Sequence, residues 1–354
     1  MPSADDIAKR YEKKYGHKAA ASGRFQPHTD VTPTGILALD YALGTGGWPD
    51  GSIIEVFGPP DIGKSSIIGL NAFIEAQKRG KMCGYVALEP GFDPKWAAKL
   101  GVDLDKLVIG WPDDGQQAFD MLYDYIMDDD IDFIVFDSIG AVLRPSEAGD
   151  KGKPSQGGQS ALITWGVKRI QTPAWKRKKT VIFLNQIRDD MNARIPGLVE
   201  SPGGHALKHT AEIRIQLKPG KDRYTAKIDG EDVIIGRSIV AIIKRTKRDE
   251  GSNKRAVFDF YGMETDDAPF GIDRTADVLQ TAMRTGVIKR AGPSYQHSSF
   301  PGGKLLGQSK VAEFFEQSPQ AVTTIRDEVL KAMSDKKVIK PTFQLVDQEA
   351  ADGA

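Results

Sequence analysis

The chain has 354 residues, with 48 basic and 48 acidic side chains, so its formal net charge is zero. This balance argues against binding of nucleic acid through a strongly basic overall charge, although local basic surfaces remain possible. Apolar residues make up 40% of the chain. A chain of this length and composition can bury a full core in one large domain with smaller attachments.

Membrane insertion and disulfide bonding are not expected. No apolar run approaches the length of about eighteen residues that a spanning helix needs, and the polar start MPSADDIAKRYEKKYG lacks a signal core. Cys83 is the single cysteine, and the five histidines are scattered, so neither a disulfide nor a zinc cluster is indicated. We expect an intracellular, cytoplasmic protein without a membrane partner.

Residues 1–30 are expected to form a short amphipathic helix and a connector that pack on another surface. From Val31 onward, short apolar runs alternate with helical patterns; the runs are SIIEVFG, MCGYVALE, LVIGW, DFIVFDS, TVIFLNQ and AEIRIQLK. This alternation is typical of an α/β fold with a mostly parallel, twisted sheet, and the lack of polar alternation indicates helices on both faces.

The later segments are expected to behave differently. YTAKIDGEDVIIG, with its Asp229-Gly230 turn, SIVAIIKRTK and AVFDFYG are predicted to extend the sheet as antiparallel strands. We place the core at residues 31–262, a small α/β C-terminal domain at 263–340 and a mobile tail at 341–354. Two long Gly-rich loops, about 144–160 and 188–204, follow strands at one edge of the sheet, and such loops are usually functional or disordered.

The stretch GPPDIGKS lies between an apolar strand and an amphipathic helix. Small residues let the backbone fold into a nest of N–H groups around a phosphate, next to the positive end of the helix. Lys64 can reach the terminal phosphates, and the Ser65 hydroxyl can ligate Mg²⁺. The residues expected to hold the nucleotide are Gly58, Pro59, Pro60, Asp61, Ile62, Gly63, Lys64, Ser65 and Ser66.

Three polar residues end predicted apolar strands. Asp137 ends IDFIVFD, where ligands of doubly wound folds collect, and is expected to be the acid near the magnesium. Glu89 ends YVALE and could hold the attacking water, or it could simply cap the next helix. Gln186 ends VIFLNQ and could sense the terminal phosphate and pass that state to the loop that follows.

These residues resemble the RecA recombinase family from about Val31 to Ser334. The stretches LALDYALGTGGWPDGSIIEVFGPPDIGKSS, VALEPGFDPKWAAKLGVD, FIVFDSIGAVL, VIFLNQIR and SPGGHALKHTAEIRI occur in the family's order and spacing. The resemblance implies a RecA-like core with catalytic Lys64, Glu89 and Gln186, an adenine bracketed by Asp93 and Trp96, and two DNA-binding loops.

The resemblance also implies contacts with DNA and with neighbouring subunits. Met191 matches the apolar wedge inserted between bases, and Lys244 matches a lysine that reaches the terminal phosphate of the neighbouring subunit. The second such contact stays open between Thr246 and Lys247. Pro60, His209 and Gln156 differ from the usual family residues. The expected DNA contacts are Arg144, Lys151, Lys153, Lys168, Arg169, Arg188, Met191, Arg194, Gly203 and Gly204.

The implied function is a DNA-dependent ATPase, with ATP and Mg²⁺ as cofactors. It would form helical filaments on single-stranded DNA and exchange strands with a homologous duplex, in a bacterial cell or a phage-infected host. Two alternatives remain, a ring helicase built on the same core and a recombination mediator that does not hydrolyse ATP. Steady-state ATPase with and without DNA, combined with electron microscopy, would separate the three.

Overall fold

A computed structural model describes residues 2–16, 20–21, 30–142, 156–189, 199–200, 204–247, 254–265 and 268–334. The chain divides into two compact units, Met1–Thr281 and Ala282–Ala354. The division falls within helix α8 (Arg274–Thr285), whereas composition placed the end of the core at Gly262. The first turns of α8 therefore belong with the core.

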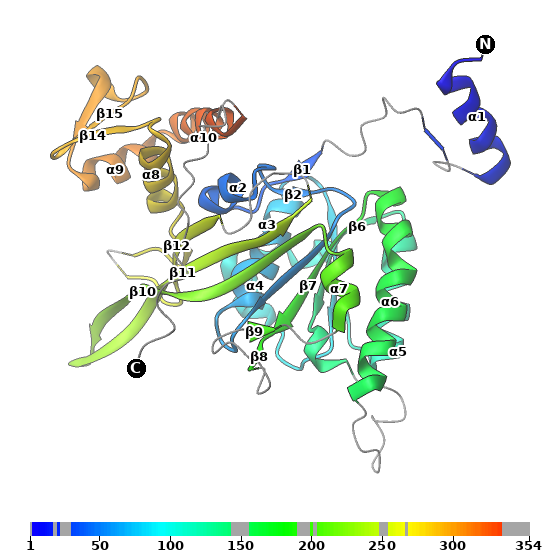
Figure 1. The fold of residues 1–354 in the computed structure, drawn as a ribbon. Coiled ribbons are helices and arrows are strands. Elements are labelled where there is room, and N and C mark those ends of the chain that lie inside the picture. Colours follow the sequence, from blue (N-terminus) through cyan, green and yellow to red (C-terminus); the bar gives the residue numbers. More distant parts are fainter. Residues whose placement is uncertain are drawn as a thin grey trace, which may run out of the picture. The chain divides into compact units, whose positions relative to one another are not determined.

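The first unit is built on a nine-stranded sheet in the order β13-β12-β11-β10-β3-β7-β6-β4-β5. Figure 1 shows β12, β11 and β10 side by side in this sheet. From β10 to β5 all neighbouring strands are parallel. These six strands are the apolar runs expected from the sequence: β3 (Ile53–Gly58), β4 (Met82–Ala87), β5 (Leu107–Gly110), β6 (Ile131–Asp137), β7 (Thr180–Gln186) and β10 (Ile213–Ile228). The predicted parallel α/β sheet is confirmed.

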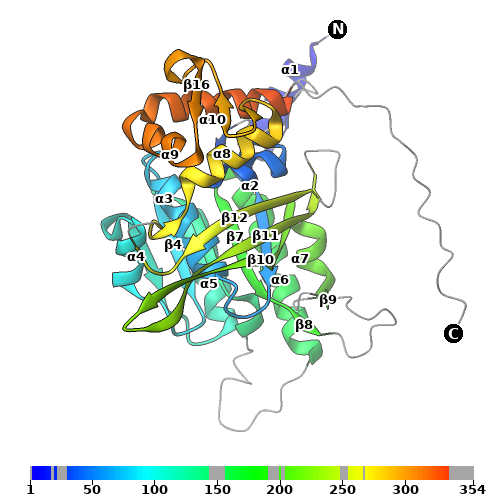
Figure 2. The ribbon, with the colours of Figure 1, turned by 90° about the vertical axis from the view of Figure 1, so that its left-hand side faces the viewer.

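Antiparallel strands extend the sheet on one side, as predicted. β10 continues through the turn at Asp229 and Gly230, both with positive φ, into β11 (Glu231–Thr246). β12 (Arg255–Tyr261) and β13 (Gly271–Ile272) follow (Figure 2). The register between β10 and β11 shifts at three places, one of them between Tyr224 and Thr225.

Helices cover both faces of the parallel strands. Along β6, Phe133 and Val135 pack in one core, and Ile134 and Phe136 pack in the other, because successive side chains of a strand point to opposite faces. The first core includes residues of α2 (Leu37–Leu43), α3 (Asn71–Gln77) and α4 (Pro94–Leu100). The second includes residues of α5 (Gly115–Met127), α6 (Gln156–Arg177) and α7 (Gly204–Thr210).

The remaining elements of the first unit are short. They are α1 (Ala4–Tyr15), β1 (Val31–Thr32), β2 (Trp48–Pro49), the π-helical segment η1 (Lys64–Leu70), the 3-10 turns η2 (Leu104–Lys106) and η3 (Ile139–Ala141), and the strand pair β8 (Arg188–Asp189) and β9 (Val199–Glu200). Helix α1 begins with a capping box formed by Ser3 and Asp6, which confirms a helix near the N-terminus.

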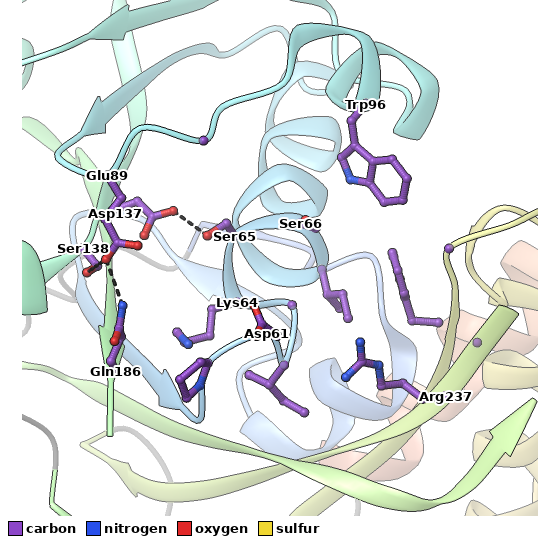
Figure 3. Close-up of a pocket in the computed structure, with 18 of the residues that line it drawn as sticks. Asp61, Lys64, Ser65, Ser66, Glu89, Trp96, Asp137, Ser138, Gln186 and Arg237 are labelled. Atoms are coloured by element: carbon purple, nitrogen blue, oxygen red, sulfur yellow. Dashed lines mark hydrogen bonds between the residues drawn. The ribbon is translucent and has the colours of Figure 1, made fainter. Parts of the chain in front are cut away.

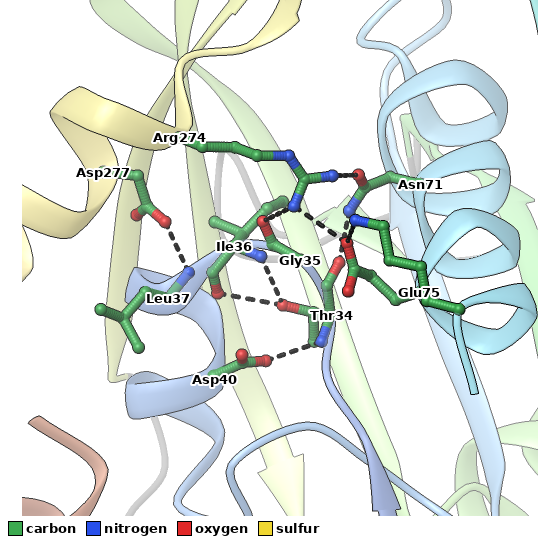
Figure 4. Close-up of polar contacts among 10 residues, drawn as sticks. Thr34, Gly35, Ile36, Leu37, Asp40, Asn71, Glu75, Arg274 and Asp277 are labelled. Carbon is green, nitrogen blue, oxygen red and sulfur yellow. Dashed lines mark hydrogen bonds and ion pairs between the residues drawn. The ribbon is translucent and has the colours of Figure 1, made fainter. Parts of the chain in front are cut away.

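The start of α8 is joined to the core by polar contacts (Figure 4). Helix α2 has no side-chain cap of its own at Ile36; instead the Asp277 carboxylate accepts hydrogen bonds from the amides of Leu37 at 2.5 Å and Ala38 at 3.0 Å. A carboxylate at the positive end of a helix is stabilising. Residues far apart in the sequence thus complete this helix terminus.

Arg274 makes the second contact of α8. Its guanidinium donates to the Gly35 carbonyl at 3.0 Å, to Asn71 Oδ1 at 2.9 Å and to Glu75 Oε1 at 2.9 Å. Burial raises the pKa of Glu75, but the hydrogen bonds and charges of Lys78 and Arg274 outweigh burial and hold this pKa below its ordinary value. The contact joins α8 to α3, the continuation of the helix that follows the glycine loop.

The second unit carries the three-stranded antiparallel sheet β14 (Lys289–Ala291), β15 (Ser294–Gln296) and β16 (Lys304–Leu306), with a 3-10 turn η4 (Pro301–Gly303) before β16. Helices α9 (Gln308–Gln317) and α10 (Pro319–Ser334) follow, and Phe300 packs against Phe314 and Phe315 of α9. In the ranges that the structure describes, none of the helices combines the length and the apolar character needed to span a bilayer.

Candidate nucleotide-binding site

The glycine loop connects β3 to η1, as its sequence context predicted. Gly63 has φ of 90°, and a Cβ at this position would lie 2.4 Å from the Ile67 side chain. At Gly58 a Cβ would lie 2.8 Å from the Leu217 carbonyl oxygen. Glycine is therefore required at both positions, once for its positive φ and once for a close approach to β10.

Lys64 lies at the start of η1 and is buried. Its ammonium donates to the carbonyls of Pro59 at 2.8 Å and Gly58 at 3.3 Å, so the side chain folds back over the loop that it follows. Burial lowers the pKa of Lys64, and the nearby carboxylates of Asp137, Glu89 and Asp61 oppose that effect.

The next residue of the loop contacts the end of β6. Ser65 Oγ donates to Asp137 Oδ2 at 2.5 Å, and the Tyr85 hydroxyl donates to the same oxygen at 2.6 Å. Burial raises the pKa of Asp137, while these two hydrogen bonds lower it. Burial also raises the pKa of the Tyr85 hydroxyl. The sequence predicted the proximity of Ser65 and Asp137 but not the contribution of Tyr85.

Glu89 does not cap the next helix; Asp93 does so, accepting hydrogen bonds from the amides of Lys95 and Trp96. Glu89 Oε1 instead accepts hydrogen bonds from Ser138 Oγ and from Gln186 Nε2, the latter at 3.0 Å (Figure 3). The ends of β4, β6 and β7 therefore meet in one polar group.

These residues line a cavity of about 540 Å³. Trp96, on α4, forms part of its wall, and its ring packs edge-on against Phe270 at 5.0 Å between centroids. Trp96 Nε1 is buried and has no hydrogen-bond partner among the described residues. The cavity lining includes Pro60, Asp61, Ile62, Gly63, Lys64, Ser65, Ser66, Glu89, Trp96, Asp137, Ser138 and Gln186.

The opposite wall comes from the antiparallel part of the sheet, which the sequence reasoning did not assign to the site. Ile234, Arg237 and Gly236 of β11 line the cavity, together with Phe260 and Gly262. No motif identifies these residues, because an arginine in an antiparallel strand usually faces solvent. Only the strand order, which places β11 beyond β10, brings them next to the loop.

The predicted interfacial residues lie near the end of β11. Lys244 is exposed and is not part of the cavity lining. Lys247 is also exposed, and its ammonium donates to the Thr210 carbonyl at 3.2 Å. Between them, Arg245 donates to the carbonyls at the end of α7, which places a cation at a helix C-terminus.

Two predicted DNA contacts on α6 differ in their surroundings. Lys168 is exposed. Arg169 is ion-paired to Asp120, and its guanidinium lies 4.2 Å from the Tyr123 ring centroid and 5.1 Å from that of Trp165. Arg169 is therefore held within the protein surface, a contact that the basic pattern of the sequence did not reveal.

Most of the predicted loop contacts lie outside the described residues: Arg144, Lys151, Lys153, Met191, Arg194 and Gly203. Arg188 belongs to β8, and Gly204 begins α7. Helix α6 already begins at Gln156, so the end of the first predicted loop, 144–160, is helical. The pattern of glycines there indicated a loop, although helix α6 packs its later turns in the core.

The donor atoms at the loop fit a hard cation. Mg²⁺ prefers hydroxyl, carboxylate and phosphate oxygens, and Ser65 and Asp137 present the first two side by side. Among the residues described, no group of three or more His, Cys, Asp or Glu side chains could by itself hold a metal ion. Phosphate oxygens of a nucleotide would have to complete such a coordination sphere.

A parallel sheet with helices on both faces, a glycine loop between strand and helix, and an acid at the end of a neighbouring strand define a P-loop nucleotide-binding protein. Comparison with known proteins defines a single family within this class. The model of the RecA N-terminal domain matches residues 4–261.

Curated relatives extend over more of the chain. Protein RecA of Thermotoga neapolitana is 33% identical over 336 residues, which cover 93% of this chain and 91% of the relative. Protein RecA of Bifidobacterium longum is 31% identical over 355 residues, with 99% and 83% covered. The chain belongs to the RecA family of recombinases, which places it among the ATP-binding and DNA-binding proteins of recombination and repair.

Proposed function

We propose that the protein polymerises with ATP and Mg²⁺ on single-stranded DNA, pairs that strand with a homologous duplex and exchanges strands, while DNA stimulates ATP hydrolysis. Its place of action would be the cytoplasm, in association with the nucleoid, in a bacterial cell or a phage-infected host. The observation that carries this proposal is the hydrogen bond between Glu89 and Gln186.

The loop residues would bind the triphosphate. The backbone amides after Gly63 and the start of η1 supply N–H donors, and Lys64 would exchange its present carbonyl partners for phosphate oxygens. This exchange would stabilise the Lys64 ammonium, because phosphate oxygens neutralise its charge better than carbonyl oxygens do. Bound Mg²⁺, held through Ser65 and Asp137, would offset negative charge on the phosphates.

Glu89 would orient the water that attacks the terminal phosphate. Glu89 follows the end of β4 by two residues and lines the same cavity as Lys64 and Ser65. A carboxylate in this position acts by positioning and by accepting a proton. In the observed arrangement Ser138 and Gln186 hold the Glu89 carboxylate, so its freedom to reach a water depends on those two partners.

Gln186 would connect the nucleotide to DNA. It ends β7, and β8 begins two residues later at Arg188, at the start of the predicted second DNA loop, 188–204. A terminal phosphate that attracts the Gln186 amide would withdraw it from Glu89 and shift the start of the loop at the same time. Such coupling works in both directions, so DNA on the loop would change the state of Glu89.

The exposed cations support contacts outside the monomer. Lys244 lies on β11 but not in the cavity, which suits a residue that reaches the nucleotide of a neighbouring subunit. Lys168, exposed on α6, can contact a DNA phosphate, and contacts of this kind are salt-dependent and largely independent of sequence.

Steady-state ATP hydrolysis measured with and without single-stranded DNA, combined with electron microscopy in a non-hydrolysable ATP analogue, tests the proposal. We expect DNA-stimulated turnover and helical filaments. Closed rings would point to a helicase, and nucleotide binding without turnover would point to a mediator; either outcome would refute the proposal.

A further inference from the structure

Strand β11 contains a bulge next to the cavity. Tyr224 of β10 pairs with Gly236, but the next residue, Thr225, pairs with Ile234, so Ile235 is an extra residue in β11. In a regular strand, residues three apart point to opposite faces. The extra residue lets Ile234 and Arg237 both line the cavity, and bulges near active sites commonly redirect side chains in this way.

The bulge is held by close packing. A Cβ at Gly236 would lie 2.5 Å from the Tyr261 ring and 2.9 Å from the Phe260 carbonyl oxygen, so only glycine fits between β11 and β12 at this point. Ile235, the extra residue, is buried, whereas Ile234 remains 57% exposed. All four residues from Ile234 to Arg237 line the cavity, but Ile235 is buried in the packing between the strands, whereas Ile234 and Arg237 are exposed there.

Arg237 changes the charge balance of the cavity. Apart from this residue, the charged groups that line it are one cation, Lys64, and the three acids Asp61, Glu89 and Asp137. Such a lining by itself repels a polyphosphate. Arg237 has neither an ion pair nor a side-chain hydrogen bond among the described residues, and Figure 3 shows it on the wall across from the loop.

We propose that Arg237 is a nucleotide-binding residue that donates hydrogen bonds from the β11 wall to phosphate oxygens of ATP and ADP. Arg237 would contact the nucleotide that is bound by its own chain, as Lys64 would. Lys244, in contrast, is proposed to reach the nucleotide bound by a neighbouring subunit. A guanidinium suits this role because its several N–H donors match phosphate oxygens. The inference rests on the proposed nucleotide binding and adds a residue to it.

Arg237→Ala and its cross-strand neighbour variant Arg223→Ala form a matched pair for the test. Arg223 pairs directly with Arg237 on the same hairpin and is exposed, but it does not line the cavity. The affinity for a fluorescent ADP is measured without DNA, so that filament formation does not contribute. We expect about tenfold or greater weakening for Arg237→Ala, since it removes a charged hydrogen bond, and a change below about twofold for Arg223→Ala. Arg237→Lys should retain part of the affinity.

Competition by inorganic tripolyphosphate against the fluorescent ADP identifies the ligand group. We expect Arg237→Ala to lower the affinity for tripolyphosphate by about as much as it lowers the affinity for ADP. If Arg237→Ala binds ADP more weakly but tripolyphosphate with wild-type affinity, Arg237 contacts the base or the sugar, and the phosphate assignment is overturned. Equal ADP affinity in Arg237→Ala and the wild-type chain, with loss in Lys64→Ala, would overturn the inference while sparing the proposed function. A wild-type chain that binds no ADP would refute both.

Discussion

Gln186 Nε2 lies 3.0 Å from Glu89 Oε1 and donates a hydrogen bond to it, so the last residue of β7 directly contacts a carboxylate two residues beyond the end of β4. Strand β6 separates β7 from β4 in the sheet, and its continuation contributes Ser138 to the same carboxylate. Three strand ends therefore share one acid.

Glu89→Gln should reduce ATP turnover by about a hundredfold or more, because an amide cannot accept the proton of an attacking water. The side chain keeps its size and can still contact Ser138 and Gln186, so nucleotide affinity should stay within about threefold of wild type. Single-turnover hydrolysis and equilibrium binding of ADP separate the two effects. Turnover near the wild-type rate would remove Glu89 from the catalytic role.

Gln186→Ala should abolish the stimulation of ATP hydrolysis by DNA while leaving the DNA-independent rate within about threefold of wild type. The physical reason is that alanine cannot link Glu89 to the start of the second loop. The ratio of the rates with and without single-stranded DNA is the measurement. If the variant retains the wild-type ratio, the coupling runs through other residues.

Lys64→Ala and Lys244→Ala should fail at different steps. Lys64 lines the cavity, so its loss should weaken nucleotide binding by about a hundredfold or more. Lys244 is exposed outside the cavity, so its loss should spare nucleotide binding by the monomer and impair polymerisation. Calorimetry with ADP and light scattering with the ATP analogue test the pair. Normal assembly of Lys244→Ala would refute the role of this lysine between subunits.

Lys168→Ala and Arg169→Ala should have different effects, the first on DNA binding and the second on stability. The first should weaken binding of single-stranded DNA and lower the slope of log affinity against log salt by about 0.7, the value for one phosphate contact. The second should lower the free energy of unfolding by about 1 kcal/mol, because Arg169 contacts Asp120, Tyr123 and Trp165. Fluorescence anisotropy at several salt concentrations and urea unfolding provide the data. An unchanged salt slope for Lys168→Ala would exclude it from the DNA surface.

Arg274→Gln should lower the free energy of unfolding more at neutral pH than in acid, when each is compared with the wild-type protein at the same pH. Because the pKa of Glu75 is held below its ordinary value of 4.5, the ionised carboxylate stabilises the fold above that pH, and this contribution is lost as the pH falls through the folded-state pKa. The variant should lose about 1–3 kcal/mol near pH 7 and much less near pH 3.

Urea unfolding at the two pH values measures this difference, with Arg79→Gln as a control. Arg79 is exposed and follows the same helix as Glu75. A loss for Arg274→Gln that does not change with pH would mean that its bonds to Gly35 and Asn71, rather than the charge of Glu75, account for the effect.

Much of the site could be predicted because its elements are local in the sequence. The glycine loop is one continuous segment, and Asp137 and Gln186 end apolar runs that are typical of buried parallel strands. The carboxyl ends of such strands meet at one edge, so their proximity follows from the fold class. The antiparallel hairpin could be predicted for the same reason, since Asp229-Gly230 defines its turn locally.

Contacts that depend on pairing between distant strands needed the tertiary structure. The position of Arg237 depends on one extra residue in β11 relative to β10, and neither strand alone reveals a register shift. Likewise, Arg169 looks like any surface cation until α5 brings Asp120 and Tyr123 beside it. The periodicity of a sequence indicates which face of a helix or strand is buried. The residues that this face contacts depend on strand register and helix packing, and these are determined by the sum of contacts across the whole sheet.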